Sequence, residues 1–218
     1  MKIKYLFLVS FMLPFILFAQ QDEKAEEILD RMAEKNKSHE TIVAEFKIKI
    51  SNLQSEDYNQ ERKGTIIIKG DKYKLDLNNS IVFYDGETMW NYLKEANEVN
   101  ISESSGSGEQ DILNHPNKIF ELYKQDFKYE FIGNTTINGK QAYEIDLYPR
   151  DLEEDYSRIR LTVFHSDDNI YSAKLYGKDG ARYKFIIEQM NVNEQIEDSV
   201  FVFDKSDYPD VEVIDMRF

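Results

Sequence analysis

Hydrophobic and polar side chains alternate along most of the chain beyond residue 40. Between residues 45 and 50, Phe46, Ile48 and Ile50 alternate with charged side chains, a pattern typical of a strand with one buried and one solvated face. Comparable strands are predicted at residues 64–69, 72–77, 81–84, 88–93, 98–101, 128–132, 141–148, 158–165, 170–176 and 181–192. Glycine, asparagine and aspartate separate many of them at hairpin distances. The pattern therefore predicts a mainly β protein built from antiparallel hairpins.

One amphipathic helix is expected before the strands. From Asp22 onward, in DEKAEEILDRMAEKNK, apolar residues recur on one helical face, with acidic residues early and lysines late. The members of this stripe are Ala25, Ile28, Leu29, Met32 and Ala33. Such a stripe indicates a helix that packs on a sheet, and it requires no further function.

A second helical pattern interrupts the strands. It follows a polar run, SESSGSGEQD at residues 102–111, which we expect to be a mobile loop. In the next segment Pro116 suits a first helical turn, and the apolar stripe that follows consists of Ile119, Phe120, Leu122, Tyr123 and Phe127. A short apolar helix beside a polar loop suggests a lid.

The first residues, MKIKYLFLVSFMLPFILFAQQ, have the organisation of a secretory signal peptide. Two lysines precede an apolar stretch that is too short for a membrane span, and the small Ala19 ends it. We expect cleavage after Ala19, so that residues 1–19 are the signal peptide and residues 20–218 form one domain, soluble in the periplasm. The sequence contains no cysteine, so neither a cysteine-linked lipid anchor nor a disulfide is expected.

Charge and motifs narrow the classes of function. The 27 Lys+Arg and 41 Asp+Glu residues give a formal net charge of -14 at pH 7, which argues against nucleic acid as a partner and allows only transient membrane contact. His39, His115 and His165 lie far apart and match no metal-binding spacing or nucleophile–base pair. Neither a glycine-rich phosphate loop nor a GxSxG motif occurs in the sequence. We therefore expect a protein that is not an enzyme and that has no metal site and no cofactor.

Aromatic side chains are abundant, with 14 Tyr and 14 Phe in the chain. Large rings on curved antiparallel strands can fill the core of a sandwich or small barrel, or they can line a cavity. Composition by itself leaves both interpretations open.

The stretch GTIIIKGDKYKLDLNNSIVFYDGETMWNYLKEANEVNI, residues 64–101, resembles the outer-membrane lipoprotein carrier family, the LolA-like proteins, especially the forms found in Bacteroidota. Its hairpin YDGETMWNY is the most telling part, because the family shows an Asp-Gly turn followed by a Trp-x-Tyr strand there. The signal peptide, the N-terminal helix, the strand around Phe46, the helix that contains Pro116 and the final segment VEVIDMRF agree with the family in position and order. The resemblance thus covers nearly the whole mature chain.

This resemblance implies a fold and a function. The fold is one strongly curved antiparallel sheet, an incomplete barrel, with the N-terminal helix and a lid helix covering an apolar cavity. The function is that of a periplasmic chaperone that accepts acylated lipoproteins from an inner-membrane ABC-type extractor and carries them to the outer membrane, where the sequence does not identify the acceptor. We expect the acyl chains and the lid to be contacted by Phe46, Ile48, Ile66, Ile68, Val82, Tyr84, Met89, Trp90, Ile119, Phe120 and Tyr123.

The sequence departs from the family at one position. Family members commonly carry an arginine just after the strand that begins here at Gly64, and its side chain holds the lid closed through hydrogen bonds to lid carbonyls. Gly70 stands at that place, between Lys69 and Lys72. We therefore expect closure to depend on apolar contact, unless one of the two lysines acts as the donor.

Two alternatives to lipoprotein transport remain open at this stage. The first is a carrier for another lipid or amphiphile, which belongs to the same binding class. The second is a periplasmic regulatory domain that senses mislocalised lipoproteins and binds a membrane protein.

Overall fold

The computed structural model describes residues 16–52, 55–103 and 127–217. The predicted lid helix, with Ile119, Phe120 and Tyr123, lies outside the described residues, except for Phe127. The prediction is wrong for Phe127, because it begins the strand Phe127–Ile137 and is buried in the core. Most of the predicted mobile loop and most of the predicted signal peptide also lie outside the described residues. Cleavage after Ala19 therefore stays a prediction.

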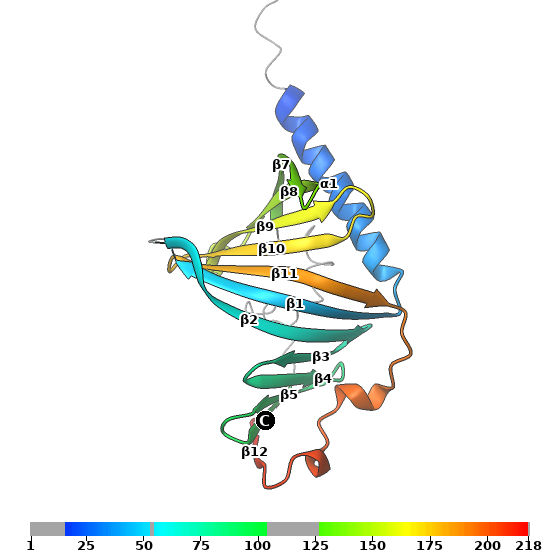
Figure 1. The fold of residues 1–218 in the computed structure, drawn as a ribbon, viewed down its shortest axis with the longest axis vertical. Coiled ribbons are helices and arrows are strands. Elements are labelled where there is room, and N and C mark those ends of the chain that lie inside the picture. The colour runs from blue at the N-terminus through cyan, green and yellow to red at the C-terminus, as the bar shows by residue number, and fades with distance from the viewer. Residues whose placement is uncertain (1–15, 53–54, 104–126, 218) are drawn as a thin grey trace, which may run out of the picture.

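Within these ranges, twelve strands form a single sheet (Figure 1). Their order across the sheet is β12-β6-β5-β4-β3-β2-β1-β11-β10-β9-β8-β7. The strands are β1 (Thr41–Asn52), β2 (Ser55–Lys69), β3 (Lys72–Leu77), β4 (Ser80–Tyr84), β5 (Thr88–Leu93), β6 (Glu98–Glu103), β7 (Phe127–Ile137), β8 (Lys140–Pro149), β9 (Tyr156–Phe164), β10 (Ile170–Gly177), β11 (Ala181–Val192) and β12 (Glu212–Asp215). The sheet is curved but not closed, because β7 and β12 remain as its two edges. The predicted fold class, an incomplete antiparallel barrel, is confirmed.

Hairpins account for most of the strand order. Consecutive strands pair with one another from β1 to β6, and again from β7 to β11. The long-range pairing of β1 with β11 joins these two series into one sheet. One pair departs from the antiparallel rule: β12 lies parallel to β6, with Glu212 opposite Glu98.

Helix α1 (Ile16–Lys37) packs across the β7–β10 part of one face of the sheet (Figure 1). The predicted stripe is buried there, from Ala25 to Ala33, against Ile145, Leu147 and Leu161 of the strands. The helix begins at Ile16 and thus extends further toward the N-terminus than the predicted start at Asp22. Within the described residues, none of the helices has the length and hydrophobicity needed to cross a bilayer. We call the face that α1 covers the inner face of the sheet.

The chain after β11 crosses to the opposite, outer face. It passes β3 to β5 through two short 3₁₀ turns, η2 (Asp198–Phe201) and η3 (Lys205–Asp207), before it reaches β12 (Figure 1). Phe201 is fully buried on the way. We call residues 193–211 the C-terminal strap.

Candidate functional site

An apolar cavity of about 400 Å³ lies on the inner face, beside the region that α1 covers. Its wall is formed by alternate residues of β1, β2, β3, β10 and β11, because successive side chains of a strand point to opposite faces. The lining residues are Asn36, Ile42, Ala44, Phe46, Ile48, Ile50, Arg62, Ile66, Ile68, Leu75, Leu77, Ile159, Ile170, Ala173, Leu175, Tyr183, Phe185, Ile187 and Met190. The cavity is within the size range of small-molecule sites.

The open volume of the cavity depends on one glycine of β2, Gly64. Gly64 is paired with Phe46 across β1 and β2, and the phenyl ring covers it. A side chain at position 64 would meet Cζ of Phe46 at 2.5 Å. The glycine therefore lets the ring lie flat against the sheet, and the volume above the ring stays open.

The chemistry of the wall is that of a hydrocarbon-binding site. Asn36 and Arg62 are the polar side chains among the lining residues, together with the hydroxyl of Tyr183. Asn36 is already engaged, since its Nδ2 donates to the carbonyl oxygen of Met32 at 2.8 Å. In the described part of the chain, no group of three or more His, Cys, Asp or Glu side chains could hold a metal ion. The arrangement of the described residues is chemically suited to an apolar ligand such as a hydrocarbon chain.

The structure brings four of the expected contact residues into this cavity: Phe46, Ile48, Ile66 and Ile68 line it. Val82 and Tyr84 share the inner face but lie further along the sheet, since Val82 is opposite Leu75 and Tyr84 is opposite Tyr73. Met89 is opposite Tyr84 and shares that face. None of these three lines the cavity among the described residues. Acyl contact by any of the expected residues stays a prediction.

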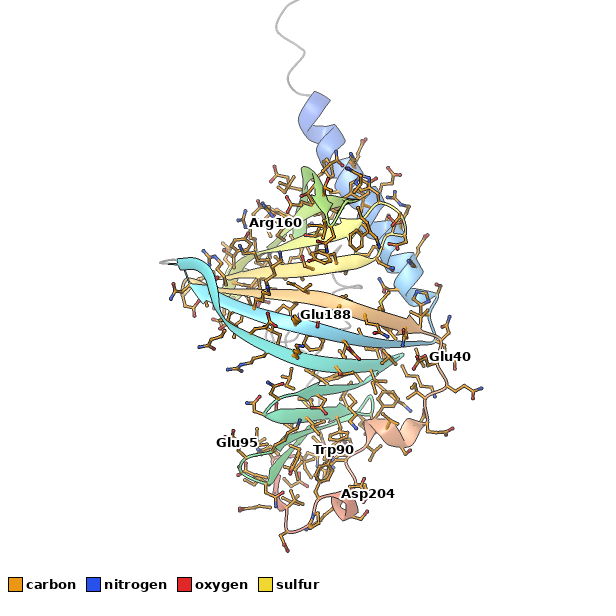
Figure 2. The ribbon with its side chains drawn as sticks, viewed as in Figure 1. Glu40, Trp90, Glu95, Arg160, Glu188 and Asp204 are labelled. Carbon is orange, nitrogen blue, oxygen red and sulfur yellow. The ribbon has the colours of Figure 1, made fainter. Side chains whose placement is uncertain are left out.

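Trp90 lies on the outer face, away from the cavity. It is opposite Phe83, whose ring packs edge-on against Phe203 of the C-terminal strap at 5.8 Å. Figure 2 shows Trp90 on the part of the sheet beside the strap. Tyr92, two residues on, packs against Tyr208 of the strap in a tilted arrangement, with 4.4 Å between ring centroids. The rings of this hairpin therefore hold the strap against the sheet, and the expectation that Trp90 faces the cavity is corrected.

Sequence reasoning missed the far wall of the cavity, which β10 and β11 supply. Leu175, Phe185 and Ile187 show the period-two pattern, so their strands were predicted, but their place beside β1 was not. That place depends on the pairing of Phe46 with Ile187 and of Ile48 with Phe185. No local signal encodes a pairing between segments so far apart.

A second, polar hollow surrounds Gly70, with His39, Lys69, Lys72 and Asp198 among its lining residues. Lys69 donates to the Asp198 carboxylate at 2.8 Å and to the carbonyl oxygen of Ile196 at 2.8 Å, and Lys72 donates to Asp198 at 2.7 Å. The bonds from Lys69 and then Lys72 lower the pKa of Asp198 to about 2. Both lysines thus fasten the C-terminal strap.

Gly70 itself has a φ of +57°, in the left-handed region that favours glycine. An arginine at this position would be strained, so the family's latch arginine does not fit this turn. The predicted lid lies outside the described residues, so its closure by apolar contact stays a prediction.

The outer face carries the charges. Asp146 is fully buried and accepts hydrogen bonds from Arg160 at 2.7 and 2.8 Å and from Arg158 at 3.0 Å. The hydrogen bond to Asp146 raises the pKa of Arg160. Figure 2 labels Arg160 and Glu188, and Glu188 forms an ion pair with Lys47 at 2.5 Å. The cavity wall on the inner face is thus largely apolar, with Arg62 as its one cation among the described residues, whereas the outer face carries many charged side chains.

Solved structures share this fold at low sequence identity. An uncharacterised conserved protein from Thermus thermophilus is 13% identical with a TM-score of 0.59, and the match covers 88% of this chain and 99% of that one. A DUF1329 family protein from Desulfovibrio piger is 16% identical with a TM-score of 0.50, covering 86% and 99%. A LolA superfamily protein from Nitrosomonas europaea is 13% identical with a TM-score of 0.43, covering 82% and 97%.

No curated protein matches the chain. A family model does: residues 15–163 match the model described as outer membrane lipoprotein carrier protein LolA. The matched segment is most of the chain, and it contains α1, the cavity strands β1 to β3 and the aromatic hairpin formed by β4 and β5. The chain therefore belongs to the outer membrane lipoprotein carrier protein family, LolA.

Proposed function

We propose that this protein is a periplasmic carrier that shields the acyl chains of lipoproteins in the inner-face cavity and ferries them from the inner to the outer membrane. The observation that carries the proposal is the cavity itself, whose wall is almost entirely aliphatic and aromatic. Membership of the LolA family supports the choice of lipoproteins as cargo. In this proposal the protein acts by binding alone, without catalysis or a cofactor.

Burial of hydrocarbon supplies the binding energy. Each methylene removed from water contributes ~0.8 kcal/mol, so a sixteen-carbon chain represents roughly 12 kcal/mol before any cost is subtracted. Ordering the chain and the cavity side chains offsets a part of this. A carrier needs such an intermediate balance, because cargo must be held across an aqueous compartment and then released.

The proposal also places the protein between two partners. An inner-membrane ABC-type extractor would load it, and an acceptor at the outer membrane would unload it. The formal net charge of -14 favours brief contact with anionic membranes over lasting attachment. Mass spectrometry of material that co-purifies with the protein from the periplasm tests this assignment, since it distinguishes a lipoprotein from a free lipid.

The cavity is tested by placing a charge in its wall. Ile68 lines the cavity, whereas its neighbour Ile67 lies on the outer face of the same strand, and both side chains are half-buried. Ile68→Glu is expected to weaken binding of a fluorescent triacylated peptide at least about tenfold, because a carboxylate near hydrocarbon loses water. Ile67→Glu, the matched control, is expected to leave binding within about twofold of wild type, because it faces away.

Circular dichroism and urea unfolding would establish that both variants are folded. If the wild-type protein did not bind the peptide, the proposed function would fail. Equal weakening by the two variants would show that the peptide binds elsewhere.

A further inference from the structure

The cavity wall contains one cation among the described residues, Arg62 of β2. It lies opposite Ile48 in the β1–β2 pairing, on the inner face with Ile66 and Ile68. Its side chain is exposed, so it stands at the mouth of the cavity and not within it. An apolar pattern along β2 would place a hydrophobic residue here, as it does at Ile66 and Ile68 further along the same face.

Among the described residues, Arg62 has no counter-charge. None of the described lining residues is acidic, and Arg62 forms no hydrogen bond or ion pair within the ranges 16–52, 55–103 and 127–217. The neighbouring cations of β1 differ in this respect, because Lys47 and Lys49 on the outer face each lie 3.8 Å from Glu61. The guanidinium is thus hydrated when the cavity is empty, with its stem against apolar side chains.

The position of Arg62 matches one end of a long hydrocarbon chain. The cavity extends along β1 from Ile42, opposite Ile68, to Ile50, one inner-face position beyond Ile48, which is opposite Arg62. The seven residues from Ile42 to Ile48 span ~20 Å, the length scale of a long acyl chain. A chain lying along this wall from Ile42 would have its other end beside the guanidinium.

We propose that, among amphiphiles other than lipoproteins, the cavity prefers those whose acyl chain carries an anionic group, a carboxylate or a phosphate, which pairs with Arg62 at the mouth. This inference rests on the proposed acyl-binding function and goes beyond its lipoprotein cargo, whose ester- or amide-linked acyl chains carry no such group. Arginine suits such groups because its planar fork donates two parallel hydrogen bonds to a carboxylate or phosphate. The local positive charge is required here because the protein as a whole is acidic and repels anions.

The test compares a fluorescent long-chain fatty acid with its methyl ester, which has the same chain and no charge. The wild-type protein is expected to bind the acid about tenfold more tightly, since a charge-assisted hydrogen bond contributes roughly that factor. Arg62→Gln is expected to remove most of this preference, measured as the ratio of the two affinities, because it weakens binding of the acid far more than binding of the ester. Arg62→Lys is expected to retain a part of it, because the charge remains without the fork.

Lys63→Gln is the matched control, since it removes one positive charge from the next residue, on the outer face opposite Lys47. It is expected to keep the preference for the acid. A salt titration of the wild-type protein adds a measurement that needs no variant: binding of the acid should weaken with ionic strength, and binding of the ester should not. Displacement of the bound fatty acid by anionic lysophosphatidylglycerol, with zwitterionic lysophosphatidylcholine as the control, shows whether a phosphate headgroup can replace the carboxylate.

The outcomes separate the two proposals. If the wild-type protein binds acid and ester equally, the role of Arg62 is overturned while acyl binding stands. If it binds neither, acyl binding itself fails. An equal loss of the acid preference in Arg62→Gln and Lys63→Gln would show that general electrostatics, and not a contact at the mouth, produces the preference.

Discussion

Gly64→Ala is the substitution that probes the cavity floor most directly. A Cβ at this position would lie 2.5 Å from Cζ of Phe46, 2.9 Å from the backbone oxygen of Asp76 and 2.9 Å from Cδ2 of Leu77. Carbon atoms in contact are ~3.5 to 4.0 Å apart, so the phenyl ring must move by at least about 1 Å. The ring lines the cavity, and the Asp76 oxygen belongs to the backbone of the adjacent strand and cannot move easily.

The expected cost follows from these contacts. Overpacking a core by one methyl typically costs ~1 to 3 kcal/mol. Replacing glycine also lowers the conformational entropy of the unfolded chain, which stabilises the folded state by ~0.4 to 1 kcal/mol. Gly64→Ala should therefore lower the free energy of unfolding by roughly 1 to 2 kcal/mol, measured by urea denaturation. Because the Phe46 ring is displaced, affinity for a series of acyl chains should also change most for the longest chains.

A double-mutant cycle with Phe46→Leu identifies the source of the cost. Leucine removes the atom that the new methyl would meet, so the double variant should lose at least about 0.5 kcal/mol less than the sum of the two single variants. Strict additivity would show that the ring is not the obstacle. A Gly64→Ala protein as stable as wild type would refute the packing argument altogether.

Two further predictions concern the outer face. Asp146→Asn should lower the free energy of unfolding by about 3 kcal/mol in urea denaturation, because it leaves two arginines around a buried, uncharged amide. Asp76→Asn, in an exposed pair with a lysine, should cost under about 1 kcal/mol, and equal losses would contradict the reasoning. Burial, and then the positive charges of Lys174 and Lys49, lower the pKa of Lys184 below its ordinary value of 10.5. The unfolded chain therefore binds this proton more tightly than the folded protein does. At neutral pH the lysine is protonated in both states, so its charge destabilises the fold there. Lys184→Gln should therefore stabilise the fold at about pH 7, with a gain that shrinks toward about pH 10; a gain that does not depend on pH would refute this origin.

Local patterns predicted most of the described strands and the first helix, but not β12 or the first half of β2. The alternation of Phe46, Ile48 and Ile50 and the turns between strands predicted β1 and its neighbours, because a strand with one wet face must repeat every two residues. The 3.6-residue stripe of Ala25 to Ala33 predicted the buried face of α1 for the same kind of reason. The departure at Gly70 also came from sequence, and its positive φ explains why glycine stands there.

Alternation shows which residues share a face, but it does not say which face becomes the inside. Phe83, Trp90 and Tyr92 form one apolar row on the hairpin of β4 and β5. Of these three residues, Trp90 was expected to face the cavity. In the folded chain the C-terminal strap covers that row, so the rings are buried on the outer side. The assignment depends on a contact with residues more than a hundred positions away.

The sequence by itself determined most of the strands, the first helix, the family resemblance and the alternation of faces along β1 and the second half of β2, because each depends on neighbours within a few positions. Only the tertiary structure decided the far wall of the cavity, the outward position of Trp90 and the place of Arg62 at the mouth. Those features depend on the pairing of β1 with β11 and on the path of the strap. Such long-range pairings are selected by the free energy of the whole sheet, and no short segment carries that information.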